Sequence, residues 1–320
     1  MEPKVSRRAL LAGGAVMLSQ ALPARAADEK PAQHKLKVAI FSKHLQFLAA
    51  GEELAKAAAD IGFDGIDITV RRGGHVKPDR VVQDLPPLVG IIRQHGLEVP
   101  MITADIVDTQ TPGAEDILKT MAALGIHKYR WGGYRYVAGQ PYAAQLEQMK
   151  PRIAKLAALN ARYQACAMYH THSGTGVVGA SIWDLYVLLK DFDPNAVGVN
   201  YDVGHATIEG GLGGWINSFR ITEPHLRGIA VKDFIWAKDA GGNWQAQFQP
   251  LGEGMVHFPQ FFAMVVDSGF LGPLQLHFEY PLGGATDGRA TLGNITKEEV
   301  FGAMKRDLAT LRGYLGKANL

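Results

Sequence analysis

Histidine, lysine and carboxylate side chains recur at the ends of short apolar runs in this sequence of 320 residues. The clearest cases are His170-Thr171-His172, Asp202-Val203-Gly204-His205, Lys232 and Glu279. Imidazole and carboxylate groups bind divalent metals and move protons, and an ammonium group stabilises a negatively charged oxygen. Once brought together, such side chains can take a proton from a carbon beside a carbonyl group and return it elsewhere or expel a leaving group.

Four of these groups have an expected role in that chemistry. Glu279 or His172 is the expected base. His205 is expected to bind the substrate or to act as the acid, and Lys232 is expected to stabilise an oxyanion. The alternative for Lys232 is a buried ion pair with Asp233 that braces the end of its strand. Isomerisation, epimerisation, dehydration and β-elimination all use the same proton transfer, so the residue types do not separate these reactions.

Further polar and aromatic residues at the strand ends are expected to contact a substrate. They are Lys43, His44, Asp67, Arg71, His75, Arg130, Trp131 and Asp233. The alternative for Asp67 and Arg71 is a structural ion pair, and the alternative for Trp131 is packing. Without a metal, Lys232, Arg71 and His170 would supply the positive charge of the site.

The elements that must position these residues alternate along the chain. Strands are predicted at residues 36–41, 65–70, 98–103, 128–131, 163–169, 196–201, 226–231 and 274–278. Helices are predicted at residues 52–61, 80–95, 114–124, 142–160, 181–190, 214–219, 258–268 and 296–315, the second interrupted by Pro86 and Pro87. Strands that alternate with helices indicate a parallel sheet built from βαβ units.

Eight such units predict an α/β fold with a single (β/α)8 barrel, the TIM barrel, over residues 36–320. An open doubly wound sheet is the rival fold, but residues 42–46 after the first strand lack its glycine-rich phosphate turn. We therefore also expect no nucleotide cofactor. A barrel gathers the carboxyl ends of its strands at one face, where the candidate residues would meet.

Several segments resemble the xylose-isomerase-like barrels, a family that includes sugar-phosphate isomerases and epimerases, inosose dehydratases and apurinic endonucleases. The resemblance extends over about residues 36–315 and rests on five segments in the family's order. They are Gly62-Phe63-Asp64-Gly65-Ile66-Asp67, Asp202-Val203-Gly204-His205, Val231-Lys232-Asp233, Leu251-Gly252-Glu253-Gly254 and Glu279.

The resemblance implies a divalent metal held by a glutamate of strand five, an aspartate of strand six, a histidine of strand seven and a glutamate of strand eight. Asp202 and Glu279 match this pattern, whereas His170 and Ala230 stand at the two other positions. The implied ligands are His170, Asp202 and Glu279, with a further histidine as a fourth, and the donor types favour Mn, Zn, Fe or Co.

The function that the resemblance implies is that of a sugar isomerase, epimerase or lyase acting on a small carbohydrate or keto-sugar. A non-catalytic carbohydrate-binding protein on a degenerate barrel is the alternative, because two ligand positions depart from the family. An apurinic endonuclease would need more metal ligands and a basic groove. The formal net charge of +2 argues against that activity and against nucleic-acid partners.

The first 26 residues have the pattern of an export signal. The pair Arg7-Arg8 precedes a short apolar stretch, and Ala24-Arg25-Ala26 offers a small-residue cleavage site, as in a twin-arginine signal. Cleavage near Ala27 would leave a flexible segment at residues 27–35 and 29 basic against 30 acidic residues. We expect a periplasmic protein without stable membrane insertion, and the sequence leaves homo-oligomer formation open. The single cysteine, Cys166, excludes an intrachain disulfide.

Overall fold

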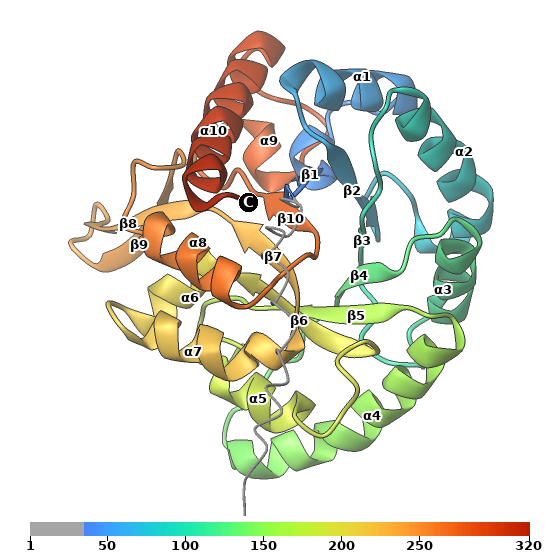
Figure 1. Ribbon diagram of the computed structural model, residues 1–320, viewed down its shortest axis with the longest axis vertical. Helices are drawn as coiled ribbons and strands as arrows, with labels where there is room; N and C mark the ends of the chain where they lie inside the picture. The colour runs from blue at the N-terminus through green and yellow to red at the C-terminus, as the bar shows by residue number, and fades with distance from the viewer. Residues whose placement is uncertain (1–34) are drawn as a thin grey trace, which may run out of the picture. The chain divides into compact units, whose positions relative to one another are not determined.

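Eight parallel strands close into a barrel in the computed structural model, which describes residues 35–320 (Figure 1). The predicted signal peptide and nearly all of the predicted flexible segment lie outside these residues. Around the barrel the strand order is β1-β10-β7-β6-β5-β4-β3-β2. The strands are β1 (Val38–Phe41), β2 (Gly65–Val70), β3 (Ile102–Ala104), β4 (Lys128–Trp131), β5 (Cys166–His170), β6 (Val197–Asp202), β7 (Leu226–Val231) and β10 (Leu274–Leu276). The predicted (β/α)8 barrel is confirmed.

The first and last strands close the barrel, with Val38 paired to Leu274 and Ile40 to Leu276. Six of the strands, β1, β2, β3, β5, β6 and β10, are buried along their whole length, as expected for parallel strands covered by helices. Their apolar side chains form one core with the inner faces of the helices. The strand ends are therefore fixed in position by the core beneath them.

Helices surround the barrel (Figure 1). The longer ones are α1 (Gly51–Ile61), α2 (Val81–Gln94), α3 (Ala114–Ala123), α4 (Tyr142–Arg162), α6 (Val203–Gly210), α7 (Gly214–Thr222), α8 (Phe258–Asp267) and α10 (Lys297–Ala318). The shorter ones are η1 (Ser42–Leu45), η2 (Pro78–Arg80), α5 (Trp183–Leu189), η3 (Glu223–His225) and α9 (Gly284–Asp287). Within residues 35–320, none of the helices combines the length and the hydropathy of a membrane span.

Two local predictions differ from the structure at prolines. Strand β3 begins at Ile102 rather than at residue 98, because Pro100 has no N–H to donate to a neighbouring strand. Helix α2 runs through Pro86 and Pro87 without a break. The carbonyl groups that lose their intrahelical donors belong to the exposed Val82 and Gln83, where water can satisfy them.

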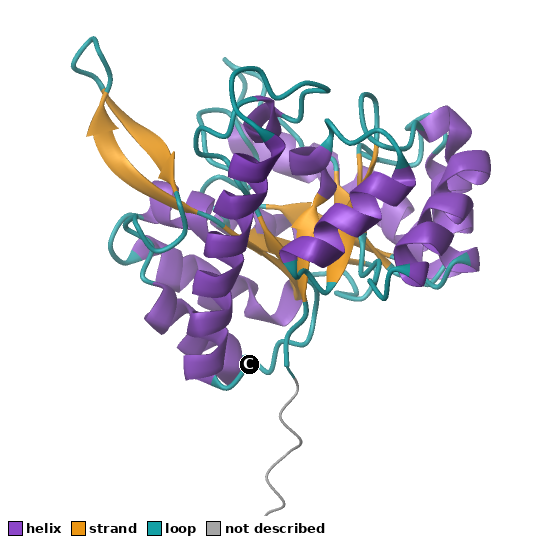
Figure 2. Ribbon diagram, turned by 90° about the horizontal axis from the view of Figure 1, so that it is seen from above, coloured by secondary structure: helices purple, strands orange, loops and turns teal. Residues whose placement is uncertain are grey.

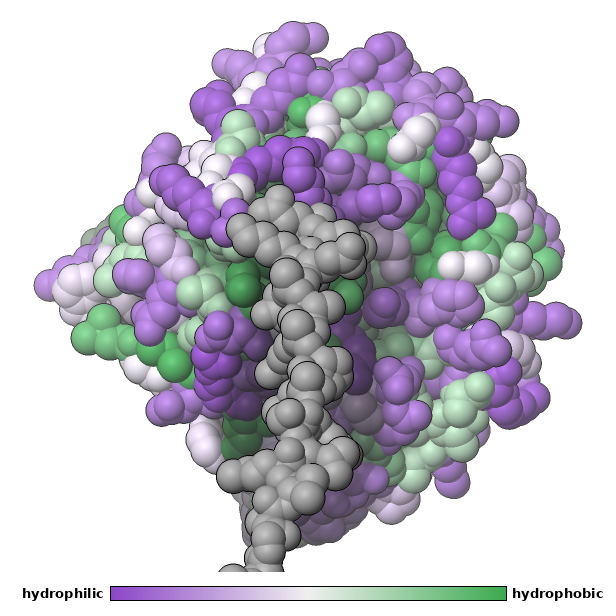
Figure 3. Space-filling view, in the orientation of Figure 1, coloured by the Kyte–Doolittle hydropathy of each residue, from purple (hydrophilic) through white to green (hydrophobic). Residues whose placement is uncertain are grey.

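Two elements beside the site were not predicted from the sequence. Helix α6 starts directly after β6, and a two-stranded antiparallel hairpin, β8 (Asp233–Lys238) and β9 (Trp244–Gln249), follows β7. The hairpin projects beyond the barrel (Figure 2). The molecular face seen in Figure 3 is mainly hydrophilic, with apolar side chains in small groups.

Candidate active site at the carboxyl ends of the strands

Lys232, directly after β7, lies at the centre of a buried cluster of charged and polar side chains. Only 2% of its side chain is exposed. Its Nζ atom lies 2.9 Å from Oε2 of Glu279, 3.2 Å from Oδ2 of Asp202 and 2.6 Å from Nε2 of His205. A buried ammonium group is tolerated only when it is paired and hydrogen-bonded, and the two carboxylates provide that pairing.

Two hydrogen bonds, one at its side chain and one at its backbone N–H, hold Asp202 in place. It ends β6 and is the N-cap of α6, where its Oδ1 accepts the backbone N–H of His205 at 3.0 Å. Its own N–H donates to Oγ1 of Thr171 at 2.8 Å. Glycine is required at position 204, since a Cβ atom there would lie 2.7 Å from the side chain of Lys232. The second oxygen, Oδ2, is therefore fixed facing the site.

Oδ2 of Asp202 faces two further histidines, and the three side chains form a candidate metal site. It lies 3.4 Å from Nε2 of His170 and 3.9 Å from Nδ1 of His277. One ligand atom from each residue falls within 4.8 Å of the others. Four donor nitrogens or oxygens at typical Zn–N distances lie about 3.3 Å apart around a tetrahedral ion. The spacing thus suits a divalent transition metal.

The protonation and bonding of these histidines also suit metal ligands. Within residues 35–320, Nδ1 of His170 and both ring nitrogens of His277 are buried and have no hydrogen-bond partner. Burial, and then the nearby positive charges, hold the pKa of both imidazoles well below the usual value, so both stay neutral. Two neutral imidazoles with one carboxylate are a common set of ligands for Fe(II) and related ions.

Glu279 does not belong to this group, although it was predicted as a metal ligand. Lys232 holds its Oε2, and Nζ of Lys43 lies 3.5 Å from its Oε1. These two ammonium groups hold the pKa of Glu279 well below its usual value, against the opposing effect of burial. His277, directly after β10, instead places Nδ1 3.9 Å from Oδ2 of Asp202 and completes the group of three.

The rings of His172 and His205 pack against each other beside Lys232, with centroids 3.9 Å apart and planes tilted by 33°. Nδ1 of His172 lies 2.9 Å from the carbonyl oxygen of Ser173, which can only accept. Nδ1 therefore carries the proton, and Nε2 keeps its lone pair. His205 accepts from Lys232 at Nε2 and donates from Nδ1 to Oγ of Ser173 at 2.8 Å. Burial lowers the pKa of both rings, so both are neutral.

Three cationic side chains surround the ring of Phe41 on the other side of the barrel mouth. Nζ of Lys43 lies 5.8 Å from the ring centroid, and the guanidinium carbons of Arg71 and Arg130 lie at 5.5 and 5.6 Å. Trp131 follows Arg130 and donates its indole N–H to the carbonyl oxygen of Val107 at 2.9 Å. The single N–H donor of the Trp131 side chain is thus bonded within the protein, while the three cationic groups lie around Phe41 at the barrel mouth.

A pocket of about 240 Å³ opens beside these groups. Its lining residues are Arg130, Trp131, Gly133, Tyr134, Arg135, Tyr169, His170, His172, Val177 and Val178. The volume lies just below the usual range for ligand sites, about 300–1,000 Å³, and suits a ligand of the size of one sugar.

The sequence of residues 55–295 matches the family described as xylose isomerase-like TIM barrel. This match spans most of the barrel and includes Asp202, Lys232 and His277. The protein belongs to the xylose isomerase-like TIM barrel family.

Solved structures of the same fold are similar over nearly their whole length. An L-ribulose 3-epimerase has a TM-score of 0.65 at 16% identity, with 88% of this chain and 95% of that chain covered. The apo form of the 3-keto-D-glucoside 4-epimerase YcjR from E. coli scores 0.61 at 15% identity, with 87% and 100% covered. A xylose isomerase-like TIM barrel protein from Mycobacterium smegmatis, in complex with magnesium, scores 0.60 at 15% identity, with 86% and 99% covered. No curated protein matches the sequence.

Two predicted substrate contacts serve the scaffold of this xylose isomerase-like barrel instead. His44 donates from Nδ1 to the carbonyl oxygen of Ala285 at 2.9 Å and accepts the N–H of Phe278 at 3.1 Å. Both ring nitrogens are therefore occupied. Asp233 accepts four backbone N–H groups, of Phe234, Gly252, Gly254 and Val256. It anchors the base of the hairpin and is not the partner of Lys232, so the alternative of a Lys232–Asp233 pair is wrong.

Sequence reasoning missed one residue that this barrel brings to the site. Phe248 of strand β9 places its ring 4.9 Å from Nζ of Lys232 and edge-on to His205, with centroids 6.0 Å apart. Phe248 reaches the site only because it lies on the hairpin. The hairpin could have been predicted from the two runs of alternating polar and apolar residues on either side of the turn at residues 239–243. His75, a predicted contact, bonds Oγ1 of Thr69 through Nδ1 at 3.1 Å.

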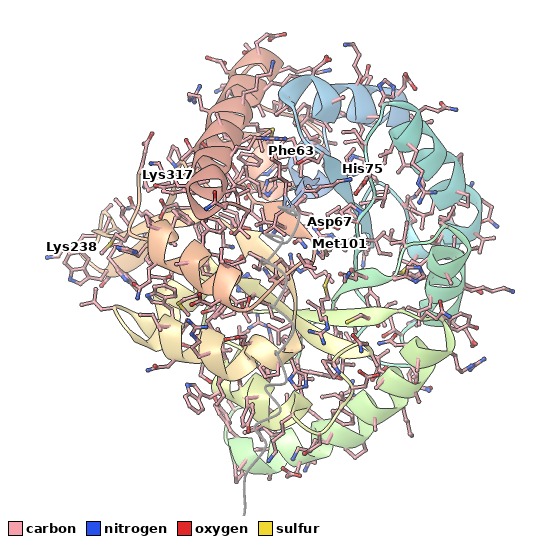
Figure 4. The ribbon with its side chains drawn as sticks, viewed as in Figure 1. Phe63, Asp67, His75, Met101, Lys238 and Lys317 are labelled. Carbon is pink, nitrogen blue, oxygen red and sulfur yellow. The ribbon has the colours of Figure 1, made fainter. Side chains whose placement is uncertain are left out.

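Asp67 points into the barrel near Met101, whereas Lys238 lies far out on the hairpin (Figure 4). The carboxylate of Asp67 is fully buried, and both of its oxygens accept from Oγ1 of Thr103, at 3.0 and 2.8 Å. No ion pair reaches it within residues 35–320, so the predicted structural pair with Arg71 is not formed. Burial raises the pKa of Asp67 from 3.8 to about 7.

Asp67→Asn is expected to stabilise the barrel by an amount that grows as the pH rises from about 4 to about 7. Because the pKa of Asp67 is raised on folding, the wild-type protein loses stability as the pH rises from about 4 through about 7. Asparagine stays neutral, so its advantage should be absent near pH 4 and on the order of 3–4 kcal/mol near pH 8. Urea unfolding at the two pH values, with the exposed Asp60→Asn as control, measures it. An equal difference at both pH values would contradict the raised pKa.

Proposed function

We propose that this protein is an exported, sugar-modifying enzyme that moves a proton at a carbon next to a carbonyl group. It would act as an isomerase, epimerase or lyase on a sugar or keto-sugar. One observation carries this proposal. His172, a neutral imidazole with a free Nε2, and Lys232, a buried ammonium group, lie beside a pocket of about 240 Å³. Two of the similar structures are sugar epimerases, which supports the same substrate class.

The residues of this site divide the work as follows. His172 lines the pocket and takes the proton at Nε2, which keeps its lone pair. Lys232 turns one N–H from Asp202, the most distant of its three partners, to the sugar oxygen on which negative charge develops. His205 and Glu279 hold Lys232 by hydrogen bonds at 2.6 and 2.9 Å and so fix the direction of that donor. Phe248 covers Lys232 and excludes water from it.

His170, Asp202 and His277 would hold a divalent metal, whose chemistry when bound is to polarise a sugar oxygen and acidify the adjacent C–H bond. We expect about one equivalent of Mn, Fe, Co or Zn per folded chain. His277→Ala should weaken metal binding by more than the roughly 10- to 100-fold typical of changes around a metal's ligands. Elemental analysis before and after chelation measures this, with the exposed His127→Ala as control. Equal metal content in both variants would exclude His277 as a ligand.

The proposed reaction is tested with mature protein recovered from the periplasmic fraction, whose N-terminal sequence also checks cleavage near Ala27. The protein is incubated with aldoses and ketoses in D2O, and NMR follows deuterium next to the carbonyl group and any new product. Glu279→Gln is expected to abolish turnover and leave sugar binding measurable, because Lys232 loses a charged partner but the pocket keeps its lining.

Each outcome of that experiment decides between defined functions. Deuterium exchange with formation of an isomeric sugar indicates an isomerase or epimerase, and a dehydrated product indicates a lyase. Sugar binding without exchange or product would overturn the enzymatic proposal in favour of a carbohydrate-binding protein. Unchanged turnover in the Glu279→Gln variant would remove Glu279 from the mechanism.

A further inference from the structure

Two guanidinium groups at the barrel mouth have no negatively charged partner. Arg71 follows β2 and Arg130 lies in β4, and their guanidinium carbons stand over the ring of Phe41 at 5.5 and 5.6 Å. Neither side chain makes a hydrogen bond or an ion pair within residues 35–320. Arginine normally uses its planar fork of donors on a carboxylate or phosphate, so two unused forks side by side call for an explanation.

The carboxylates of the site are already committed elsewhere. Asp202 and Glu279 lie on Lys232, at 3.2 and 2.9 Å, and Glu279 also faces Lys43. Among the described residues, Asp67 accepts only from Thr103. Burial, and then the like charge of Arg71, lower the pKa of Arg130 against the attraction of the more distant carboxylates. This arrangement costs folding free energy, and such costs are typical of positions kept for binding.

The adjoining pocket has the same electrostatic character. Arg130 and Arg135 line it together with two imidazoles, and no aspartate or glutamate is among its lining residues. Arg130 thus belongs both to the pocket and to the group around Phe41. An anion in the pocket would meet donors and positive charge in a partly desolvated setting, where charge-assisted hydrogen bonds are strongest.

We propose that Arg71 and Arg130 bind an anionic group of the substrate, so that the sugar carries a carboxylate or a phosphate. This inference rests on the proposed function for the reaction but not for the binding. Carboxylate and phosphate share the bidentate geometry that a guanidinium fork recognises. The neutral part of the sugar would then extend from the arginines toward His172 and Lys232.

Matched sugars test the proposal by isothermal titration. Each set holds a neutral hexose, its hexuronate and its 6-phosphate, in the gluco, galacto and manno configurations. At least one anionic member is expected to bind roughly 10- to 100-fold more tightly than its neutral counterpart. Preference for the hexuronate assigns a carboxylate, and preference for the 6-phosphate assigns a phosphate. Equal binding within every set, or no binding of any anionic sugar, overturns the proposal.

The variants Arg71→Gln and Arg130→Gln should remove this preference, lowering the affinity for the anionic sugar far more than the affinity for the neutral hexose. Both should also keep or raise the midpoint of thermal unfolding, because each removes a charge that has no partner. Arg80→Gln, at an exposed arginine paired with Asp84, is the matched control and should change neither binding value. A lower unfolding midpoint with unchanged preference would make the two arginines structural and overturn the proposal.

Binding and reaction can fail separately in these experiments. If anionic sugars bind through Arg71 and Arg130 but no deuterium exchange follows, the binding site stands and the proposed reaction is wrong. If a neutral sugar undergoes exchange and binds as tightly as its anionic counterparts, the reaction stands and the anion site is wrong.

Discussion

Replacement of Lys232 by methionine is expected to lower the turnover of the proposed reaction by about 100- to 1,000-fold, the loss typical for one donor to a developing oxyanion. The substitution also leaves Asp202 and Glu279 without their shared cation. Breaking a buried ion pair from one side costs about 3–5 kcal/mol, so the variant should unfold at lower urea concentration. Deuterium exchange in D2O and urea unfolding measure the two effects.

A second substitution isolates the structural role of Lys232. Lys232→Met combined with Glu279→Gln removes one positive and one negative charge and restores the local balance. The double variant should regain much of the lost stability, because one buried carboxylate no longer lacks a partner. Its turnover should stay absent, because Glu279→Gln alone is expected to abolish it. Stability as low as that of Lys232→Met alone would show that the pair with Glu279 does not stabilise the strand end.

The architecture of the barrel could be predicted from the sequence because its signals are local. Each strand is a short apolar run, and the helices carry their own boundaries. Gly62 ends α1 with a φ of 105°, a conformation that favours glycine. Thr296 and Glu299 form a capping box that starts α10. With strands and helices located, the alternation alone indicates where the carboxyl ends of the strands meet.

The partners of the charged residues could not be predicted, since they depend on how the strands are aligned and on competition among neighbours. Lys232 precedes Asp233 in the sequence, yet the backbone turn at residues 252–256 takes that carboxylate. Lys232 bonds instead to Asp202, at the end of β6, and to Glu279, three residues after β10. The same competition places Glu279 on two ammonium groups, and the group of His170, Asp202 and His277 forms without it. Residue types indicated the candidate residues, and only three-dimensional packing assigned their partners.

His172→Gln is expected to reduce deuterium exchange by about 100- to 10,000-fold, the usual contribution of a positioned general base. Glutamine can replace the hydrogen bond to Ser173 but has no basic nitrogen, so sugar binding should change little. The pH profile of the wild-type protein gives a second readout. Burial lowers the pKa of His172, and the base therefore stays unprotonated below the usual imidazole range. The rate should hold to a lower pH than 6.5 and fall only as the pH drops through that lowered pKa.

The comparison with Glu279→Gln decides which group takes the proton. Glu279 is ionised but held by two ammonium groups, which makes it a weak base, whereas Nε2 of His172 has a free lone pair beside the pocket. If His172 is the base, its variant loses exchange and sugar binding remains, while His127→Gln, at an exposed histidine outside the site, behaves as wild type. Exchange that survives in His172→Gln and is lost in Glu279→Gln would assign the proton to Glu279. In that case Lys43 and Lys232 would have to release the carboxylate when substrate binds, and the rate would depend on that release.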